Sequence, residues 1–363
     1  MQRHTKVGVA MSGGVDSTFA AILLKEQGYD VFGVTFQMFC HHHPAGEDKG
    51  KPSFTDVKHL CDAIGIEHVL IQCEKEFSTH VIDYFTEAYM KGLTPNPCVQ
   101  CNKWIKWGFL LDKVFELGAS YLGTGHYAGI EKNPQTGRYL LRMGRDRQKD
   151  QSYFLWQLSQ FQLAHTLFPL ASYTKKMAYQ KIESYGLHLE KSEESQEVCF
   201  IPDNDYHAFL RQKHPGKIVA GNILNTQGEV IGRHEGYPFY TIGQRKGLGV
   251  KGSKRLYLLE IRRDSNEIVV GEHDQLKGSE LFANQCNWIA IENLDRPMEA
   301  LAQIRYRAKK SPCRIIPEGD KVKVEFETPR YAISPGQSVV FYDGEYVVGG
   351  GIIMKDRQKN ANW

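Results

Sequence analysis

The sequence lacks an apolar run long enough for a signal peptide or a membrane-spanning helix. Its first six residues lead directly into a strand-like segment, so we expect a cytoplasmic protein. The net charge is also small: the sequence has 45 Lys and Arg residues and 42 Asp and Glu residues, which gives a formal net charge of +3. Such a balance does not by itself indicate a polyanionic partner, since global charge governs solubility and steering.

Cysteine is scarce and scattered, with eight residues in 363. In a chain without an export signal, this does not indicate a disulfide framework, because the cytosol is reducing. A cysteine with a role beyond packing is therefore expected to be catalytic or metal-binding. Basic residues gather in short clusters, several beside aromatic residues, although each cluster taken alone favours a solvated face. The clusters are Lys149-Asp150-Gln151, Arg245-Lys246, Arg305-Tyr306-Arg307-Ala308-Lys309-Lys310 and Lys355-Asp356-Arg357.

Strand and helix patterns alternate in the first half of the chain. Apolar runs predict strands at residues 7–11, 31–39, 68–73 and 121–124. Amphipathic runs predict helices at residues 16–27, 56–64 and 78–91 and after residue 102. This order predicts an α/β domain with a parallel sheet covered by helices on both faces.

Short strand patterns with Gly and Pro turns dominate after about residue 202. A small β-rich region is predicted from runs at 228–232, 238–243, 256–261 and 268–271, with a hairpin turn at 263–267. Runs at 289–291, 303–307, 321–327, 338–342 and 346–354 then have the spacing of a small barrel or sandwich.

A glycine-rich loop joins the first predicted strand to the first predicted helix. Residues 8–17 read Gly-Val-Ala-Met-Ser-Gly-Gly-Val-Asp-Ser, and a helix start after such a loop offers unpaired amides to an anion. The loop lacks the Gly-Lys-Ser/Thr ending of a P-loop, so it is similar instead to the pyrophosphate loop of enzymes that split ATP between its α and β phosphates. A glycine-rich turn without a ligand is the disfavoured alternative. The predicted nucleotide contacts are Ala10, Met11, Ser12, Gly13, Gly14, Val15, Asp16 and Ser17, with Asp16 beside Mg²⁺, and Phe36 and Gly125 at the carboxyl ends of later strands near the adenine.

Two thiols lie on a proline-stiffened segment, Thr94-Pro95-Asn96-Pro97-Cys98-Val99-Gln100-Cys101. We expect Cys101 to lie just before a helix, where the helix field and Lys103 favour its thiolate. Cys199 lies far away in sequence. The remaining cysteines in apolar segments, Cys61, Cys73, Cys286 and Cys313, are expected to pack in the core. The run Cys40-His41-His42-His43 has no further evenly spaced ligand and favours a surface loop over a metal site.

The order of these motifs resembles that of the tRNA-specific 2-thiouridylase family in the PP-loop ATP pyrophosphatase superfamily. The resemblance covers nearly the whole chain and also includes Thr124-Gly125-His126-Tyr127, Lys149 to Phe154, Cys199-Phe200-Ile201, Gly243 to Gly249, and the stretch from Pro335-Gly336-Gln337 to Ile352. It implies an adenine nucleotide α-hydrolase-like domain at 1–203, a central β-rich domain at 204–277 and a carboxy-terminal β-barrel at 278–363.

The resemblance further implies that ATP adenylates the C2 oxygen of the wobble uridine and that a Cys199 persulfide supplies the sulfur. Cys101 is then the partner nucleophile that releases the sulfur or resolves the persulfide as a disulfide. The implied tRNA contacts are Asn96, Pro97 and Cys98 at the target base, and His126, Lys149, Asp150, Gln151, Arg305, Tyr306 and Gln337 elsewhere. The resemblance also implies that the substrates are tRNAs for lysine, glutamate and glutamine and that a cysteine desulfurase or sulfur relay protein is the sulfur donor. It further implies a monomer that binds no membrane.

Cys98 departs from the family pattern, in which many members have aspartate at this position. The carboxylate's role in proton transfer therefore does not carry over, unless a thiol of lowered pKa replaces it. Alternatively, Cys98, Cys101 and Cys199 hold a [4Fe-4S] cluster or zinc. Two other classes stay open: an amide-forming synthetase fed by ammonia, which needs no cysteine pair, and a non-catalytic RNA-binding module, which needs no intact nucleotide loop.

Overall fold

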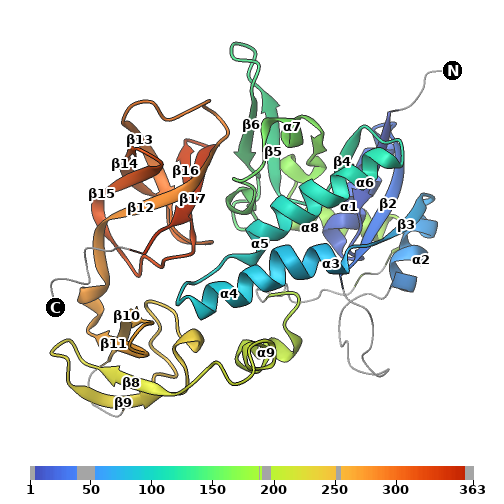
Figure 1. The fold of residues 1–363 in the computed structure, drawn as a ribbon. Coiled ribbons are helices and arrows are strands. Elements are labelled where there is room, and N and C mark those ends of the chain that lie inside the picture. The colour runs from blue at the N-terminus through green and yellow to red at the C-terminus, as the bar shows by residue number, and fades with distance from the viewer. Residues whose placement is uncertain (1–4, 39–53, 188, 190–197, 251–254, 356–363) are drawn as a thin grey trace. The chain divides into compact units, whose positions relative to one another are not determined.

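The computed structural model describes residues 5–38, 54–187, 189, 198–250 and 255–355 (Figure 1). The chain forms two compact units. The first comprises residues 1–81, 98–194 and 345–348, and the second comprises residues 82–97, 195–344 and 349–363. Within the described ranges, no helix is long and apolar enough to cross a membrane.

The first unit is built on a five-stranded sheet in the order β3-β2-β1-β4-β7. Its strands are β1 (Lys6–Ala10), β2 (Asp30–Gln37), β3 (Glu67–Gln72), β4 (Tyr121–Gly123) and β7 (Thr166–Leu167). All four pairings are parallel, which confirms the predicted sheet. The chain moves outward from β1 to β3 and then returns to the other side of β1 for β4, so the strand order reverses beside β1.

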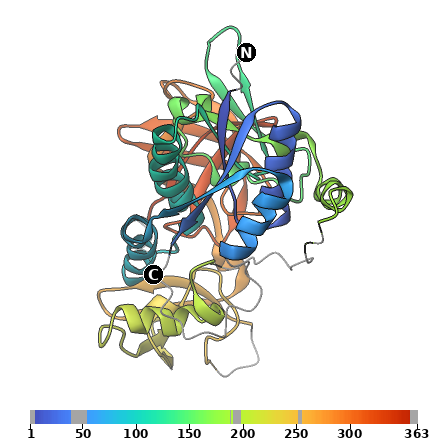
Figure 2. The same cartoon turned by 90° about the vertical axis from the view of Figure 1, so that its right-hand side faces the viewer.

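Helices cover both faces of this sheet (Figure 2). One face carries α1 (Val15–Glu26), α2 (Phe54–Ile64) and α8 (Lys175–Ser184), whose apolar residues share a core with Val7 and Val9. On the other face, a Cβ added to Gly8 would lie 2.8 Å from a methyl group of Val114 in α6 (Leu111–Glu116). Gly8 therefore lets α6 approach the sheet closely.

Two long helical segments begin earlier than the sequence predicts. The first runs through α3 (Glu74–Phe77), the π-helical η1 (Ser78–Asp83) and α4 (Tyr84–Met90), so the predicted start at residue 78 is wrong. The second runs through α5 (Pro97–Gln100), the π-helical η2 (Cys101–Leu110) and α6. Proline is well suited to the first helical position because its missing N–H has no intrahelical partner there. Cys101 consequently lies one turn inside the helix, and its predicted place just before it is wrong.

The first unit also contains elements that the sequence analysis did not predict. The hairpin of β5 (Ala128–Lys132) and β6 (Tyr139–Met143) pairs with Tyr346 and Val347. Short helices complete this part of the chain: η3 (Ser152–Phe154), α7 (Gln160–Ala164) and η4 (Pro169–Ser172).

The second unit contains a four-stranded sheet in the order β10-β11-β8-β9. Its strands are β8 (Gly221–Leu224), β9 (Val230–His234), β10 (Tyr257–Arg262) and β11 (Glu267–Gly271), and they are accompanied by α9 (Tyr206–Lys213), η5 (Pro202–Asn204), η6 (Tyr237–Phe239) and η7 (His273–Leu276). The antiparallel pairing of β10 with β11 confirms the predicted hairpin. The strand predicted at 238–243 is wrong, because Pro238 lacks a ladder donor and Gly243 takes φ +87°.

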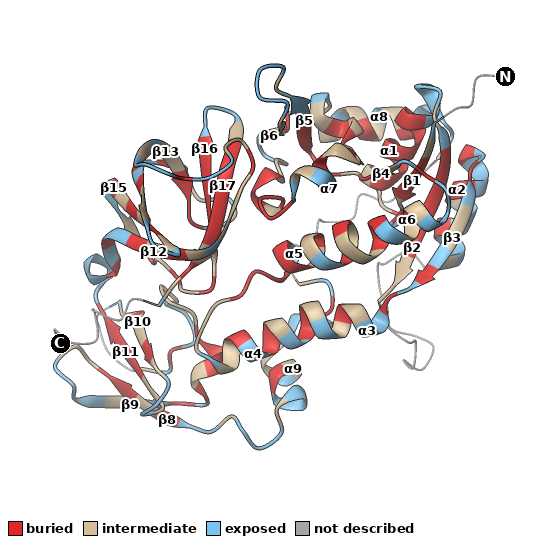
Figure 3. Cartoon of the chain, turned by 45° about the horizontal axis from the view of Figure 1, so that its top comes forward, coloured by how far each residue is buried: buried red, intermediate tan, exposed pale blue. Residues whose placement is uncertain are grey.

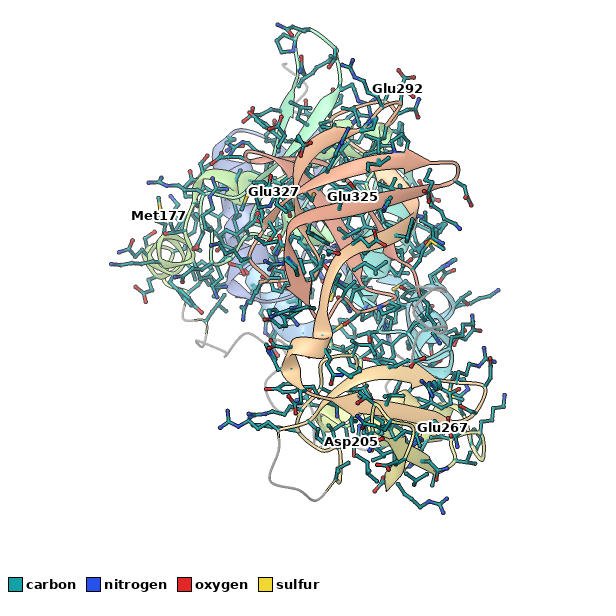
Figure 4. All side chains as sticks on the ribbon, turned by 90° about the vertical axis from the view of Figure 1, so that its left-hand side faces the viewer. Met177, Asp205, Glu267, Glu292, Glu325 and Glu327 are labelled. Carbon is teal, nitrogen blue, oxygen red and sulfur yellow. The ribbon has the colours of Figure 1, made fainter. Side chains whose placement is uncertain are left out.

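The carboxy-terminal strands of the chain form a closed barrel. Its strands are β12 (Lys277–Trp288), β13 (Met298–Gln303), β14 (Ser311–Glu318), β15 (Lys321–Tyr331), β16 (Ser338–Asp343) and β17 (Tyr346–Ile353). They follow the order β12-β15-β14-β13-β16-β17, and β12 pairs back onto β17. Figure 3 shows β16 and β17 largely buried, and Figure 4 shows Glu325 and Glu327 on β15. The barrel confirms the predicted fold class.

Two predicted strands in this region are wrong. Residues 289–291 follow the end of β12 and form no strand, and the strand predicted at 303–307 ends at Gln303. The Gln303 side chain donates a hydrogen bond to the carbonyl oxygen of Arg305, and Arg307 takes φ +63°. The backbone turns at residues 305–307, so the ladder does not continue there. β8, β12 and β14 were not predicted, and the prediction reached β13 only at its last residue, Gln303.

Candidate functional site

The glycine-rich loop between β1 and α1 is shaped by hydrogen bonds among its own residues. Ser17 Oγ donates to the carbonyl oxygen of Gly14 at 3.0 Å and accepts from the backbone N–H of Ser12 at 3.2 Å. Gly13 takes φ +78°, which a residue with a side chain rarely adopts. No side chain caps α1 at Gly14, so the loop leaves the helix start to other partners. Such a turn can hold a phosphate against backbone amides.

The loop lies where the strand order of the sheet reverses, between the carboxyl ends of β1 and β4. Ligands of open α/β sheets bind at such a switch point. Gly125 follows β4, and a Cβ added to it would lie 2.6 Å from the carbonyl carbon of Asp16 and 2.8 Å from the amide nitrogen of Ser17. Phe36, half-buried, lies near the end of β2. Predicted phosphate and adenine contacts therefore share one edge of the sheet.

Asp16, in the first turn of α1, is held at both carboxylate oxygens. The Tyr127 hydroxyl donates to Oδ1 at 2.8 Å, and the Lys175 ammonium pairs with Oδ2 at 2.7 Å. Lys175 was missed by the sequence analysis because it lies 159 residues from Asp16 in a segment without a recognisable motif. The only sequence signal for Lys175 is its place directly after Thr174, a residue type that commonly caps the start of a helix.

His126 is buried, with 8% of its surface exposed. Its Nε2 lies 3.3 Å from Lys106 Nζ, and its Nδ1 lies 2.7 Å from Thr124 Oγ1. Because an ammonium group only donates, Nε2 accepts and Nδ1 carries the hydrogen. Burial, followed by the charge of Lys106, holds the pKa of His126 well below its usual value. The side chain thus fixes Lys106 and offers little surface for the predicted contact with RNA.

The predicted tRNA-contact segment around Asp150 folds back onto Tyr127. Asp150 accepts from the backbone N–H of Gly144 at 2.9 Å and from the Ser152 hydroxyl at 2.8 Å. The Gln151 side chain accepts from the backbone N–H of Tyr127 at 3.1 Å. Asp150 and Gln151 therefore shape the segment that would present neighbouring groups to a ligand.

The loop that leads to the cysteines of the second helical segment is held by the Pro335–Gln337 turn of the second unit. The Gln337 amide donates to the carbonyl oxygens of Thr94 at 3.1 Å and Pro95 at 3.2 Å. The backbone N–H of Thr94 donates to the carbonyl oxygen of Pro335 at 2.8 Å. Gly336, at φ +91°, packs directly against this loop. Gln337 is thus engaged with the loop that carries the predicted base contacts.

The residues predicted at the target base differ in exposure. Asn96 and Pro97 are buried, Cys98 is exposed, and Cys101 is partly exposed. Cys98 and Cys101 are three positions apart on one helical segment, a spacing at which side chains are neighbours. Because the helix begins at Pro97, the favourable field of its amino terminus acts more strongly on Cys98 than on Cys101.

Cys199 is exposed on a turn closed by a hydrogen bond from the backbone N–H of Ile201 to the carbonyl oxygen of Val198 at 3.1 Å. The next residue, Phe200, is buried, and its ring centroid lies 5.2 Å from Phe85 and 5.8 Å from Phe209. The aromatic anchor fixes the turn while the thiol faces outward. Cys101 belongs to the first unit and Cys199 to the second.

The four cysteines expected in the core are less accessible than Cys98 and Cys199, which are exposed. Cys61, Cys73 and Cys313 are buried, which confirms the packing prediction for these three, whereas Cys286 is half-buried. Burial raises the pKa of Cys61 and Cys286 to about 11 and that of Cys73 and Cys313 to about 12. These thiols are inert at neutral pH.

Metal ligands do not gather anywhere in the described part of the chain, where no three or more His, Cys, Asp or Glu residues form a group able to hold a metal ion. Cys98 and Cys101 belong to the first unit and Cys199 to the second, so the alternative cluster of these three cysteines stays a prediction. The run Cys40-His41-His42-His43 lies outside the described residues.

The remaining predicted RNA contacts lie on turns. Arg305 is exposed and Tyr306 is half-buried after β13, with the Arg307 guanidinium 5.4 Å from the Tyr306 ring centroid. Lys149 is half-buried in the first unit. A cation beside an aromatic ring is a suitable surface for stacking with RNA bases.

Comparisons with known proteins cover nearly the whole chain. Three family models match: the tRNA methyl transferase HUP domain at residues 5–203, the tRNA methyl transferase PRC-barrel domain at 207–272 and the aminomethyltransferase beta-barrel domain at 278–353. The tRNA-specific 2-thiouridylase MnmA of Pelotomaculum thermopropionicum is 46% identical over 357 residues, which are 96% of this chain and 97% of that protein. The tRNA-specific 2-thiouridylase MnmA of Desulfitobacterium hafniense is 45% identical over 364 residues, covering 96% and 98%.

Proposed function

Because the chain belongs to the tRNA-specific 2-thiouridylase family, we propose that it uses ATP to replace the C2 oxygen of the wobble uridine of tRNA with sulfur. The observation that carries this proposal is the loop of residues 10–17 at the switch point of the sheet, closed by Gly125. A methyl transferase, the activity for which two of the matching families are named, has no need to split ATP. A pyrophosphate-type loop favours ATP-dependent activation of a carbonyl oxygen.

In the first step, Mg²⁺-ATP binds with its phosphates against the amides of the loop. The C2 oxygen of the uridine attacks the α phosphorus, and the bond between that phosphorus and the oxygen bridging to the β phosphorus breaks. Pyrophosphate leaves with the electron pair, and C2 now carries AMP as a leaving group. Backbone amides at the start of α1 would stabilise the charge that develops on the phosphates.

In the second step, the terminal sulfur of a Cys199 persulfide attacks C2, and AMP leaves with the electrons of the C2–O bond. The Cys101 thiolate then attacks Sγ of Cys199 and breaks its bond to the transferred sulfur. The products are 2-thiouridine and a Cys101–Cys199 disulfide, which a thiol reductant returns to two thiols by supplying two electrons. The exposure of Cys199 supports this proposal, because a donor protein must reach it.

Cys98 occupies the position at which many family members have aspartate. It lies at the start of the helix, directly after Pro97. We assign it a place at the target base with Asn96 and Pro97, because the extracted base must be held before chemistry can take place. The proposed steps use the cysteine pair alone, and the iron measurement described below tests whether a cluster is needed.

The tRNA is expected to contact His126, Lys149, Asp150, Gln151, Arg305, Tyr306 and Gln337 or the segments that they shape. We propose lysine, glutamate and glutamine tRNAs as substrates and a cysteine desulfurase or relay protein as sulfur donor. Domain boundaries after residues 203 and 277 are part of the same proposal.

The test is anaerobic turnover of the purified protein with wobble-uridine tRNA, ATP, Mg²⁺ and a persulfide donor. Mass spectrometry follows 2-thiouridine, while AMP and iron are measured in the same samples. We expect one AMP for each 2-thiouridine and no requirement for iron. Cys199→Ser should bind tRNA normally and form no 2-thiouridine, whereas Cys286→Ser, at a half-buried thiol, should retain activity.

Each competing class gives a different result. AMP formation with a small acid and no tRNA would indicate a synthetase, and tRNA binding without AMP would indicate a binding module. Methylated tRNA formed from S-adenosylmethionine would indicate the methyl transferase activity for which two of the matching families are named. Thiolation that appears only with bound iron would indicate a mechanism that uses an iron–sulfur cluster and not the persulfide pair.

A further inference from the structure

The nucleotide loop has no cation of its own, although the ligand proposed for it is strongly anionic. Between Ala10 and Ser17, the loop offers backbone amides, two serine hydroxyls and one carboxylate. Any positive charge that the protein adds to that of Mg²⁺ has to come from elsewhere in the chain. Lysine commonly serves as the point charge in phosphate sites.

Lys175 brings a positive charge to this loop. Its ammonium lies 2.7 Å from Asp16 Oδ2, and Asp16 is the second residue of α1. The side chain of Lys175 is 17% exposed, and that of Asp16 is 30% exposed. The pair is therefore partly screened from water, yet open enough for a ligand at the start of α1 to reach it.

The fold fixes Lys175 in this position. The Thr174 hydroxyl accepts a hydrogen bond from the backbone N–H of Met177, so α8 begins at Lys175; Figure 4 labels Met177. The backbone N–H of Lys175 also donates to the Asp146 carboxylate at 3.1 Å. Ala178, one turn further along α8, is buried in the core that α8 shares with α1.

Asp16 is restrained as firmly as Lys175. Its other carboxylate oxygen accepts a hydrogen bond from Tyr127, whose side chain is 2% exposed. With one oxygen held by a buried hydroxyl and the other by an ammonium group, the carboxylate is oriented to hold a lysine. These two contacts leave lone pairs on both carboxylate oxygens, so the predicted place of Asp16 beside Mg²⁺ stays compatible with them.

We propose that Lys175 is the phosphate-binding lysine of this nucleotide site and that Asp16 is the residue that positions it. The inference rests on the proposed function, because it takes the ligand to be ATP. As the bond between the α phosphorus and the bridging oxygen breaks, negative charge grows on the departing pyrophosphate. The Lys175 ammonium neutralises this charge without transferring a proton, and AMP stays on the uridine oxygen.

The experiment measures binding of α,β-methylene-ATP, which cannot be cleaved at the reacting bond, to the full chain in the presence of Mg²⁺. Lys175→Met is compared with Lys176→Met, which removes the neighbouring exposed lysine. We expect Lys175→Met to weaken binding by roughly tenfold to a hundredfold, as loss of a charge-assisted contact does. Lys176→Met should remain within about twofold of the unchanged protein. Affinity for tRNA should be the same in all three proteins.

Lys175→Arg and thermal unfolding separate this role from a structural one. Arginine keeps the charge, so it should recover most of the binding lost in Lys175→Met. If the ion pair only joins α8 to α1, Lys175→Met lowers the melting temperature and leaves the affinity for the analogue unchanged, and this result overturns the proposal. If Lys175→Met fails to fold, Lys175→Arg and Lys175→Gln provide the same comparison.

The outcome is distinguishable from a failure of the proposed function. That failure would appear as the absence of 2-thiouridine from the unchanged protein, whatever its affinity for nucleotide. Failure of the present inference would appear as an active protein whose Lys175 variants bind the analogue normally.

Discussion

The nucleotide loop and the loop of residues 94–97 both lead into helices, but different parts of the chain hold them. The nucleotide loop is shaped mainly by hydrogen bonds among Ser12, Gly14 and Ser17, at most five residues apart. The loop of residues 94–97 is held by Gln337, 243 residues away from Thr94. The first loop therefore carries most of its conformation in its own sequence. The second depends on the folding of the carboxy-terminal barrel.

The nucleotide loop also depends on one distant neighbour, Gly125. We expect Gly125→Ala to reduce activity more than any other substitution considered below. The new Cβ would lie 2.6 to 2.8 Å from backbone atoms of Asp16 and Ser17, so α1 or the end of β4 must shift. A displacement of about 1 Å in a reacting site costs on the order of a hundredfold in rate. We expect AMP formation to fall by about that factor while affinity for tRNA is retained.

Gly232→Ala is the matched control, because its Cβ would meet only ordinary contacts at 3.5 Å or more. Equal activity of Gly125→Ala and the unchanged protein would show that the loop tolerates movement of its neighbour, and that Gly125 has no part in shaping the site.

Gly336→Ala should disturb the other loop with a smaller effect. Gly336 has φ +91°, and a Cβ there would lie 2.9 Å from both Cβ of Leu93 and the backbone nitrogen of Thr94. We expect kcat/KM for thiolation to fall by roughly tenfold to a hundredfold, because the target base loses its fixed neighbours. Binding of α,β-methylene-ATP should not change.

Gly344→Ala controls for backbone strain, since Gly344 has φ +53° but nothing within 4 Å of its added Cβ. If both substitutions reduce thiolation equally, the strain itself is responsible and the contact with residues 93–94 is not.

Gln337→Ala removes two hydrogen bonds from this loop without adding strain or a clash. Because a typical hydrogen bond contributes about 1 kcal/mol, we expect kcat/KM for thiolation to fall by roughly fivefold to thirtyfold. The salt dependence of tRNA binding should keep its slope, since no phosphate-binding charge is lost. A tRNA affinity that falls as much as kcat/KM does would instead support a direct contact between Gln337 and tRNA.

The same contrast explains how much could be predicted from the sequence. The parallel sheet and the nucleotide loop follow from local patterns, since residues 7–11 and 12–17 contain their own strand and turn signals. Lys175 could not be predicted, because its partner Asp16 is brought to it only by the packing of α8 on α1. The helix start at Pro97 was missed because Asn96 lies between two prolines, a pattern that also predicts an extended loop. Predicted strands at 289–291 and 303–307 failed where turns replace the ladder.

His126 connects the segment that follows β4 with the helical segment that carries Lys106. Among these predictions, we expect its substitution to have the smallest effect, and that effect is on stability. His126 follows Gly125 and fixes Lys106 on the helical segment that carries Cys101. Burial, followed by the charge of Lys106, lowers its pKa in the folded protein, so below about pH 6.5 the unfolded chain binds a proton that the folded chain does not. The free energy of unfolding should therefore decrease as pH falls from about 6.5 towards that lowered pKa, by up to about 1.4 kcal/mol per pH unit.

His126→Gln should make this pH dependence less steep, because glutamine does not titrate while its amide can still accept a hydrogen bond from Lys106. Urea unfolding between about pH 5 and 7.5 measures the difference. Burial also lowers the pKa of His68, His207 and His234, and these residues contribute equally in both proteins. The variant should therefore retain a weaker slope and not a flat profile. Identical slopes would mean that His126 has the same pKa in the folded and unfolded chains, which would contradict the effect of burial and of the charge of Lys106 on this residue.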